Sequence, residues 1–267
     1  MPPYERFAAF YDEVMDDPGP RADRVLRWID QYRPDSTSLL ELGCGTGSLL
    51  TRMACLPSLT GLDRSPAMLA VASQKVPDAR LVEGDMRDFS LGQRFDVVVC
   101  VFDSLNHLLS FDHWQSTFAA VHRHLVDDGL FVLDVTTVGE LRRLGDDAPM
   151  VVDFDRGTAI VDVSFAEYPT AARGPEAPPS MASWDIRIFE QLGGNQYRLH
   201  HEQIRELAVP LVQLQSALEG PFTLLDAADE DGRPPTDDSV KGHFAYRRST
   251  TAHGERPADP ISSPRGR

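Results

Sequence analysis

The sequence predicts an α/β fold: a mostly parallel sheet with helices on both faces, and an antiparallel β segment inserted late in the chain. Two observations support this prediction. Short apolar strands alternate with helical segments between residues 38 and 136, and after residue 150 the apolar pattern changes to strict alternation. A length of 267 residues with 42% hydrophobic content suffices for one large α/β domain with an insertion.

The first half of the chain is expected to open with two helices. Amphipathic spacing predicts one over residues 1–16, with Tyr4, Phe7 and Tyr11 on one face, and a second that buries Trp28. Parallel strands are expected at 38–42, 59–63, 80–84, 95–101 and 130–135. The helices between them are expected over 48–55, from Pro66 with Ser65 as its cap, and from a cap at Asp112.

The second half predicts an insertion and then completion of the sheet. Alternating runs over 150–208 flank Gly193-Gly194-Asn195, which is typical of antiparallel hairpins, and residues 169–181 read as a mobile loop. A helix over 211–219 and strands over 222–229 and 243–248 follow, and the polar tail is predicted to be disordered. We therefore divide the chain into a core, a lid or insertion, a completion of the core sheet and a tail: 1–149, 150–208, 209–248 and 249–267.

Charge and cysteine content limit the partners. The net charge of −15 repels phosphate backbones, so nucleic acid is an unfavourable partner. No apolar run is long enough for a membrane span, and the acidic N-terminus does not resemble a signal peptide. Three cysteines without a CxxC pair fit the reducing cytoplasm. The histidines are not spaced for a metal site, so no metal is expected.

A glycine-rich loop follows the first strand, in the stretch LLELGCGTGSLL at 39–50. Gly43, Gly45 and Gly47 can take positive φ and let a ligand approach the backbone at the carboxyl edge of the sheet. The spacing lacks the Lys-Ser/Thr end of a phosphate loop and differs from the G-x-G-x-x-G of dinucleotide folds. Glu41 would repel a pyrophosphate, so the loop favours a cationic ligand, such as a sulfonium with an amino-acid ammonium.

Two further strand ends carry side chains suited to a nucleoside. Asp63 ends the second strand, and a carboxylate there can accept both hydroxyls of a ribose. Asp85 and Met86 end the third strand, where an acid and a flat thioether contact suit an adenine. A nicotinamide dehydrogenase shares the ribose acid but is disfavoured by the loop spacing and by Glu41.

With these motifs in order, the chain resembles the class I S-adenosylmethionine-dependent methyltransferases. The matching stretches are ELGCGTG, GLDRSPAML, EGDMRDF, FDVVVCVFDSLNHL and HLVDDGLFVLDV, the last with Asp128 in place of a family glycine. The resemblance covers about residues 4–136 plus the closing strands, and it implies a Rossmann-like, seven-stranded sheet. It looks closest to small-molecule members, including deoxysugar-amine N-methyltransferases. It implies S-adenosyl-L-methionine as cofactor, bound by Tyr11, Glu41, Gly43, Cys44, Gly45, Gly47, Asp63, Met68, Asp85, Met86 and Val101.

The same resemblance places the transferred methyl opposite the residues that follow the fourth strand. His107 is the leading candidate for a general base or an acceptor-orienting group, because imidazole titrates near working pH. Its structural alternative is a histidine that only packs at a helix start. Asp103 and Asn106 could orient an amine or hydroxyl, and Tyr11, with Tyr4, could contact the methionine part or the acceptor.

The sequence therefore predicts a cytoplasmic methyltransferase acting on an amine or hydroxyl of a small metabolite, such as a sugar or natural-product intermediate. A peptide N-terminus or side chain is an alternative acceptor, and a non-catalytic scaffold that only binds the cofactor is an alternative of another class. The antiparallel insertion is expected either to cover the mouth of the site or to form a homodimer surface.

Overall fold

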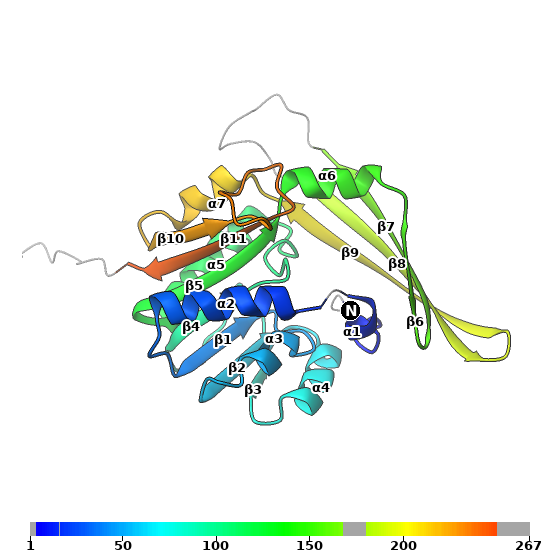
Figure 1. Cartoon of the computed structure of the whole chain (residues 1–267), viewed down its shortest axis with the longest axis horizontal. Coiled ribbons are helices and arrows are strands. Elements are labelled where there is room, and N and C mark those ends of the chain that lie inside the picture. The colour runs from blue at the N-terminus through cyan, green and yellow to red at the C-terminus, as the bar shows by residue number, and fades with distance from the viewer. Residues whose placement is uncertain (1–3, 16, 168–179, 250–267) are drawn as a thin grey trace, which may run out of the picture.

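The computed structural model describes residues 4–15, 17–167 and 180–249, which form two sheets. A seven-stranded sheet has the order β10-β11-β5-β4-β1-β2-β3, and a four-stranded sheet has the order β6-β7-β8-β9. Figure 1 shows the four-stranded sheet beside the larger one, with the N-terminal segment between them. The predicted fold class is confirmed, and the tail beyond Ser249, predicted to be disordered, lies outside the described residues.

The parallel part of the large sheet follows the predicted alternation. Its strands and the helices that follow them are β1 (Ser38–Leu42), α3 (Ser48–Arg52), β2 (Ser58–Asp63), α4 (Pro66–Lys75), β3 (Arg80–Glu83), β4 (Phe95–Cys100), α5 (Phe111–His124) and β5 (Leu125–Thr136). The sheet runs outward from β1 in both directions, to β2 and to β4. The strand order therefore reverses at β1, which is where open α/β sheets bind ligands at their carboxyl edge.

Helices cover both faces of this sheet because its strands bury side chains on both sides. Leu39 of β1 packs with α2 (Gly19–Tyr32), α3 and α4, whereas Leu40 packs with α5 and α7 (Leu211–Leu218). The sheet is completed by β10 (Phe222–Ala228) and β11 (Lys241–Arg248), and β11 runs antiparallel to both of its neighbours, β5 and β10. No helix in the described part of the chain has the length and apolarity needed to cross a membrane.

The second sheet is built from β6 (Met150–Phe154), β7 (Gly157–Ala166), β8 (Ser180–Gly193) and β9 (Gln196–Ala208), all antiparallel. We call it the lid sheet. Its β8–β9 hairpin extends away from the core (Figure 1). Trp184 pairs with Ile204 and Ala182 with Glu206, so these four residues share one face. That face packs against Phe7 and Phe10 of the N-terminal segment.

Local capping explains the differences at helix ends. Ser65 caps α4 as predicted, because its Oγ accepts a hydrogen bond from Met68 N at 3.2 Å. Asp112 was the wrong cap, since α5 begins at Phe111 after Ser110 and Asp112 lies in the first turn. The predicted loop 169–181 lies mostly outside the described residues, but its last two residues begin β8.

One helix, α6 (Val138–Asp146), was not predicted. It begins at the cap residue Thr137, whose side chain accepts a hydrogen bond from Glu140 N at 3.2 Å. Thr137 followed three residues later by Glu140 is a capping-box pattern, so the signal was present in the sequence. Figure 1 shows α6 at the junction between the core and the lid sheet.

The N-terminal helix predicted over 1–16 was wrong over residues 4–10. Only Tyr11–Val14 (α1) is α-helical, and the described residues before it form turns. The Glu202 carboxylate on β9 accepts hydrogen bonds from the backbone N–H groups of Tyr4, Arg6 and Phe7. This lid residue therefore fixes the path of the segment, which a local periodicity argument could not include.

Asp96 lies at the start of the central strand β4, at the amino edge of the large sheet, and joins it to the start of β1. These bonds allow a test of stability. The Asp96 carboxylate accepts hydrogen bonds from the N–H groups of Thr37 and Ser38, and from both their hydroxyls. Although burial alone would raise it, these donors hold the pKa of Asp96 at about 2. We expect Asp96→Ala to lower the free energy of unfolding by about 1 kcal/mol at pH 7, after discounting for solvent screening.

The pH dependence has a definite sign. A depressed carboxyl pKa stabilises the fold above the unfolded value near 4, and this stabilisation is lost as the pH falls toward about 2. Denaturant unfolding of both proteins should therefore show a difference that is full at pH 6 and shrinks below pH 4. A difference that stays constant down to pH 2.5 would contradict the assignment to the ionised carboxylate.

Candidate active site

The loop between β1 and α3 exposes backbone at the carboxyl edge of the sheet. Gly43, Gly45 and Gly47 have φ values of +68°, +50° and +76°. A Cβ on Gly43 would lie 2.6 Å from Ser104 Oγ, so glycine is required there by close packing as well as by φ. A Cβ on Gly45 would meet only Met68 Sδ, at 4.0 Å. The space above Gly45 is therefore open.

Asp63 supports this loop from the end of β2. Its Oδ2 accepts a hydrogen bond from Gly45 N and its Oδ1 from Ser65 N, both at 2.8 Å. Each oxygen keeps a further acceptor position, which a ribose diol could use. Burial raises the pKa of Asp63, against the backbone N–H groups of Ser65 and Gly45, which lower it.

Glu41 lies buried beneath the same loop with only 2% of its surface exposed. Its Oε2 has no hydrogen-bond partner among the described residues. Burial and then the Asp63 carboxylate raise the pKa of Glu41 well above its usual value. Two acidic groups with spare acceptor capacity under a bare backbone favour a ligand that carries positive charge and disfavour a pyrophosphate.

The end of β3 differs in part from the prediction. Met86 is buried, and its Cε lies 3.4 Å from the position of a Cβ on Gly43, so it borders the loop as expected. Asp85, in contrast, accepts hydrogen bonds from Arg87 Nε and Nη2 at 2.9 and 2.6 Å and pairs with Arg64 Nε at 3.4 Å. Its acceptor positions are already in use, so an adenine amine would have to displace an arginine.

Three other predicted cofactor residues lie in the core. The side chains of Cys44 and Val101 pack in the apolar cluster on the α2 face of the sheet, and Met68 is buried beside Gly45. Their backbone groups are also engaged, since Cys44 N donates to Leu62 O at 3.1 Å and Val101 O accepts from Ser104 Oγ at 2.7 Å. The role of these residues in cofactor binding therefore stays a prediction.

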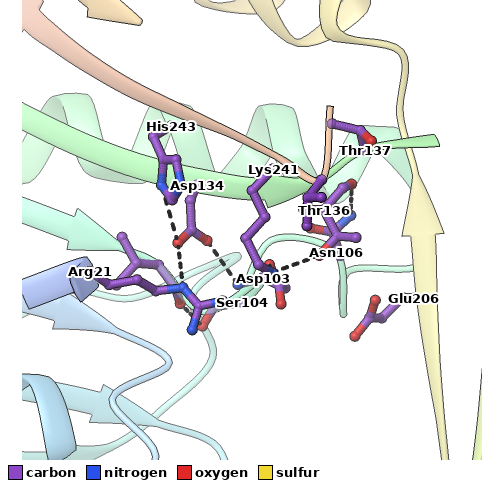
Figure 2. A network of polar contacts seen from close by, with 12 residues as sticks. Arg21, Asp103, Ser104, Asn106, Asp134, Thr136, Thr137, Glu206, Lys241 and His243 are labelled. Atoms are coloured by element: carbon purple, nitrogen blue, oxygen red, sulfur yellow. Dashed lines mark hydrogen bonds and ion pairs between the residues drawn. The ribbon is translucent and has the colours of Figure 1, made fainter. Parts of the chain in front are cut away.

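The turn after β4 holds backbone conformations that are rare outside glycine. Phe102 and Asp103 have φ values of +58° and +60°. Asp103 N donates to Asp134 Oδ1 at 2.9 Å, and the Asp103 carboxylate pairs with Lys241 Nζ of β11 (Figure 2). Although burial alone would raise it, Lys241 and Arg21 hold the pKa of Asp103 at about 2. Asp103 is thus a fixed anion at neutral pH and is poorly suited to accept a proton.

Asn106, which the sequence placed among acceptor-orienting groups, has a structural task. Its Nδ2 donates to the carbonyls of Thr136 at 3.1 Å and Leu207 at 2.9 Å, and its Oδ1 accepts from Thr136 N at 3.2 Å. Its own carbonyl accepts from Leu207 N. The side chain therefore ties the end of β9 to the end of β5, with both of its N–H donors in use and no surface exposed to a ligand.

His107 lies next to this junction and faces the N-terminal segment. Its Nε2 is 3.0 Å from Tyr4 Oη, and the two rings meet edge to face at 5.4 Å. Tyr11 packs against Tyr4, with ring centroids 5.7 Å apart. Burial lowers the pKa of His107, against the nearby Asp103 carboxylate, which raises it. The imidazole is therefore neutral at pH 7 and able to accept a proton.

One residue at this place was missed by the sequence analysis. Glu206 of β9 points from the lid sheet toward the turn that holds Asn106 (Figure 2), and its Oε1 is 3.9 Å from His107 Nε2. Alternation along β9 puts Glu206 on the same face as Ile204, which is the signal that could have found it. An acid on the apolar face of a strand is uncommon and points to a partner or a function.

The N-terminal segment closes the space between these parts. Asp12 Oδ1 accepts hydrogen bonds from Thr46 Oγ1 at 2.7 Å and Ser48 Oγ at 2.9 Å, beside the glycine loop. Glu5 accepts a hydrogen bond from Ser65 Oγ at 2.7 Å. Residues 4–15 are thus held by the core on one side and by the lid sheet on the other. Within the described ranges, no group of three metal-ligating side chains forms a metal site.

Comparison with known proteins places this geometry in a family. Residues 39–129 match the model of a methyltransferase domain. The chain is 33% identical over 168 residues to YqeM of Bacillus subtilis, named as a methyltransferase, covering 61% of this chain and 67% of that protein. It is 39% identical over 107 residues to the dTDP-3-amino-3,6-dideoxy-α-D-glucopyranose N,N-dimethyltransferase of Streptomyces fradiae. That match covers 40% of this chain and 42% of the relative.

A solved structure extends the likeness beyond the matched domain. The amino pentose methyltransferase of Micromonospora echinaspora, solved with S-adenosylmethionine bound, has a TM-score of 0.66 and 26% sequence identity, covering 86% of this chain and 90% of that one. The chain belongs to the class I S-adenosylmethionine-dependent methyltransferases, and S-adenosylmethionine is its cofactor.

The residues present fit this cofactor. The open space above Gly45, the spare acceptor positions on Asp63 and the unpartnered Glu41 oxygen suit a ligand with a ribose and a positive charge. Asp85, occupied by its arginines, departs from the expected arrangement, and the side chains of Cys44 and Val101 are packed in the core.

Proposed function

We propose that the protein catalyses methyl transfer from S-adenosylmethionine to a nitrogen or oxygen of a small metabolite. The observation that carries this proposal is the position of His107. It follows the fourth strand, beside the switch point of the sheet, and presents Nε2 to a space bordered by the N-terminal segment and the lid sheet. A buried neutral imidazole at that position can orient an acceptor and take its proton.

The glycine loop and the acids around it would hold the cofactor, which supplies an activated methyl group when bound. Gly43 and Gly45 offer bare backbone, Asp63 offers acceptors for the ribose hydroxyls, and Glu41 offers an unpartnered acceptor oxygen beneath the loop. Tyr11, in the N-terminal segment beside the carboxyl edge of the sheet, would exclude water from the reacting atoms. Because the donor is already activated, alignment and exclusion of water can supply much of the rate.

The acceptor would bind beside the place where the N-terminal segment meets the lid sheet. There Tyr4 and His107 can hold its reactive atom with the lone pair directed toward the methyl, and His107 can receive the proton that this atom loses. Named relatives that methylate amino sugars support a small acceptor of this kind. Asp103 would contribute as a fixed charge that keeps Lys241 in place, and not as a base.

Two measurements test the proposal. Calorimetric titration with S-adenosylhomocysteine should show binding, and titration with NAD should show none, which separates this function from a dehydrogenase. A screen with radiolabelled S-adenosylmethionine against small amines and alcohols should then give a labelled product. Binding of the donor without transfer to any member would favour a non-catalytic cofactor-binding protein instead.

A change at Asp63 tests the donor site. We expect Asp63→Asn to weaken S-adenosylhomocysteine binding by about 1–2 kcal/mol, because it removes the charge and leaves one of two loop N–H groups without its acceptor. Calorimetry measures this, with Asp88→Asn as the control, since Asp88 lies after β3 and takes no part in the loop. An unchanged affinity would remove Asp63 from the donor site.

A further inference from the structure

Glu206 is a buried acid that forms no ion pair with a lysine or arginine among the described residues. Only 5% of the residue is exposed, and its Oε2 has no hydrogen-bond partner among the described residues. The indole Nε1 of Trp184, on the same face of the lid sheet, lies near enough to lower the pKa of Glu206 but stands outside normal hydrogen-bond geometry. An unpartnered buried carboxyl costs stability, so its retention calls for a ligand or a chemical role.

A second acid on the same strand face shows what a structural role looks like. Glu202 lies four residues before Glu206 and accepts hydrogen bonds from three N–H groups of the N-terminal segment. Its carboxylate fastens that segment to the lid. Glu206 makes no such bond, although Tyr4 and His107 lie close to it.

Three acceptor groups converge at this point. His107 Nε2 lies 3.0 Å from Tyr4 Oη and 3.9 Å from Glu206 Oε1. An imidazole, a phenol oxygen and a carboxyl group therefore lie around a small volume. They come from the turn after β4, the N-terminal segment and the lid sheet, respectively. The His107 side chain keeps 20% of its surface exposed, so a ligand can reach the imidazole from solvent.

The local charges show which ligand fits. Lys241 is the cation next to Glu206, but its ammonium is already bound by Asp103 and by Thr136 Oγ1 at 3.0 Å. Arg21 is engaged by Asp134, with its Nε 3.5 Å from Oδ2. Asp103 and Asp134 thus engage both nearby cations, and a cationic ligand is the group that could pair with Glu206 when Glu206 ionises.

From this arrangement we infer that Glu206, with Tyr4 and His107, forms a recognition point for a cationic amine, so that the acceptor is a primary or secondary amine and not a hydroxyl. This inference rests on the proposed function and narrows it. An ammonium has N–H donors for all three groups and a positive charge that favours the ionised form of Glu206, whereas a neutral hydroxyl has a single donor and brings no charge.

The proton and electron balance is simple. The bound ammonium first gives one proton to the Glu206 carboxylate or to His107 Nε2. The freed nitrogen lone pair then forms the new nitrogen–carbon bond, and the carbon–sulfur bonding pair stays with sulfur, which becomes a neutral thioether. The held proton returns to water when the product leaves. No co-reactant is needed.

The titration of Glu206 agrees with this role. Burial and then the Asp103 carboxylate raise its pKa to about 8, although Lys241 and the Trp184 indole lower it. The other titratable groups that face it, His107 and Tyr4, are neutral at pH 7. A carboxyl whose affinity for protons approaches that of an amine can exchange a proton with it readily.

The test compares the wild type and two variants on matched acceptors. The panel contains amino sugars, nucleotide-linked aminodeoxyhexoses and peptides with a free N-terminus, each beside its hydroxyl or N-acetyl counterpart. We expect transfer to amines only. Glu206→Gln should lower kcat/KM on those amines about 10- to 100-fold, with unchanged affinity for S-adenosylhomocysteine. The control Asp185→Asn changes an acid on the opposite face of the lid sheet, which bonds His201, and should leave kcat/KM unchanged.

A readout independent of turnover uses Glu206→Leu. Because Glu206 Oε2 makes no bond, this variant should unfold at the same denaturant concentration as the wild type or a higher one, whereas a structural role predicts a lower one. Transfer to hydroxyl members, wild-type kcat/KM in Glu206→Gln, or donor binding with no amine methylated would overturn the inference. Failure to bind S-adenosylhomocysteine would instead overturn the proposed function.

Discussion

Replacing His107 by alanine should lower turnover by about 100-fold or more while leaving the affinity for S-adenosylhomocysteine unchanged. The imidazole lies beside Tyr4 and away from the glycine loop, so its removal affects the acceptor and its proton but not the donor. Single-turnover methyl transfer at saturating donor measures the first quantity, and calorimetry measures the second.

Two companion variants make this test specific. His107→Gln keeps a hydrogen-bonding group without a titrating one, so partial recovery would indicate orientation and no recovery would indicate proton transfer. His201→Ala removes an exposed histidine from the far face of the lid sheet and should behave as wild type. Because burial lowers the pKa of His107, the base form persists below about pH 6.5, and the wild-type rate should stay high there. Normal turnover in His107→Ala would place the proton route elsewhere.

Replacing Gly45 by alanine should remove most of the donor affinity, while the positive φ of +50° costs the fold only about 1–2 kcal/mol. The new Cβ would meet only Met68 Sδ, at 4.0 Å, so the protein has room for it. The same atom would occupy the space in which the ligand approaches the backbone, and overpacking of this kind costs about 1–3 kcal/mol. Calorimetric titration with S-adenosylhomocysteine measures the loss.

Gly92 provides a matched control for this variant. Its φ is +70°, and a Cβ there has no neighbour within 4 Å. Gly92→Ala therefore carries the same kind of backbone strain at a position outside the glycine loop. The two variants should unfold at similar denaturant concentrations, and only Gly45→Ala should lose donor affinity. Equal donor affinities would show that the ligand does not press against Gly45.

The fold could be predicted where each element depends on its own residues. The strands of the large sheet were found because apolar runs such as SLLEL and FDVVVC end at turn signals, and α4 was found through its Ser65 cap. The turns before Tyr11 could not be found, because they follow hydrogen bonds to Glu202, almost two hundred residues further along the chain. Local periodicity contains no information about such a partner.

The candidate site also has residues that could be predicted from the sequence and residues that could not. The glycine loop, Asp63 and His107 lie at strand ends, and their positions follow from the order of strands alone. The occupied state of Asp85 depends on the arginines that reach it, and the role of Asn106 depends on where β9 ends. Glu206 reaches His107 only because Asn106 fixes the end of the lid sheet to the core. Contacts between distant segments therefore set the acceptor side of the site.

The bonds between Asn106 and Leu207 have a consequence for how the protein would lose activity. The acceptor side requires three remote stretches of chain to meet, whereas the donor side belongs to the continuous core sheet. Opening of such a junction costs less free energy than global unfolding. Mild heating or low denaturant should thus silence catalysis while the molecule still holds its nucleoside, so that inactivation precedes melting.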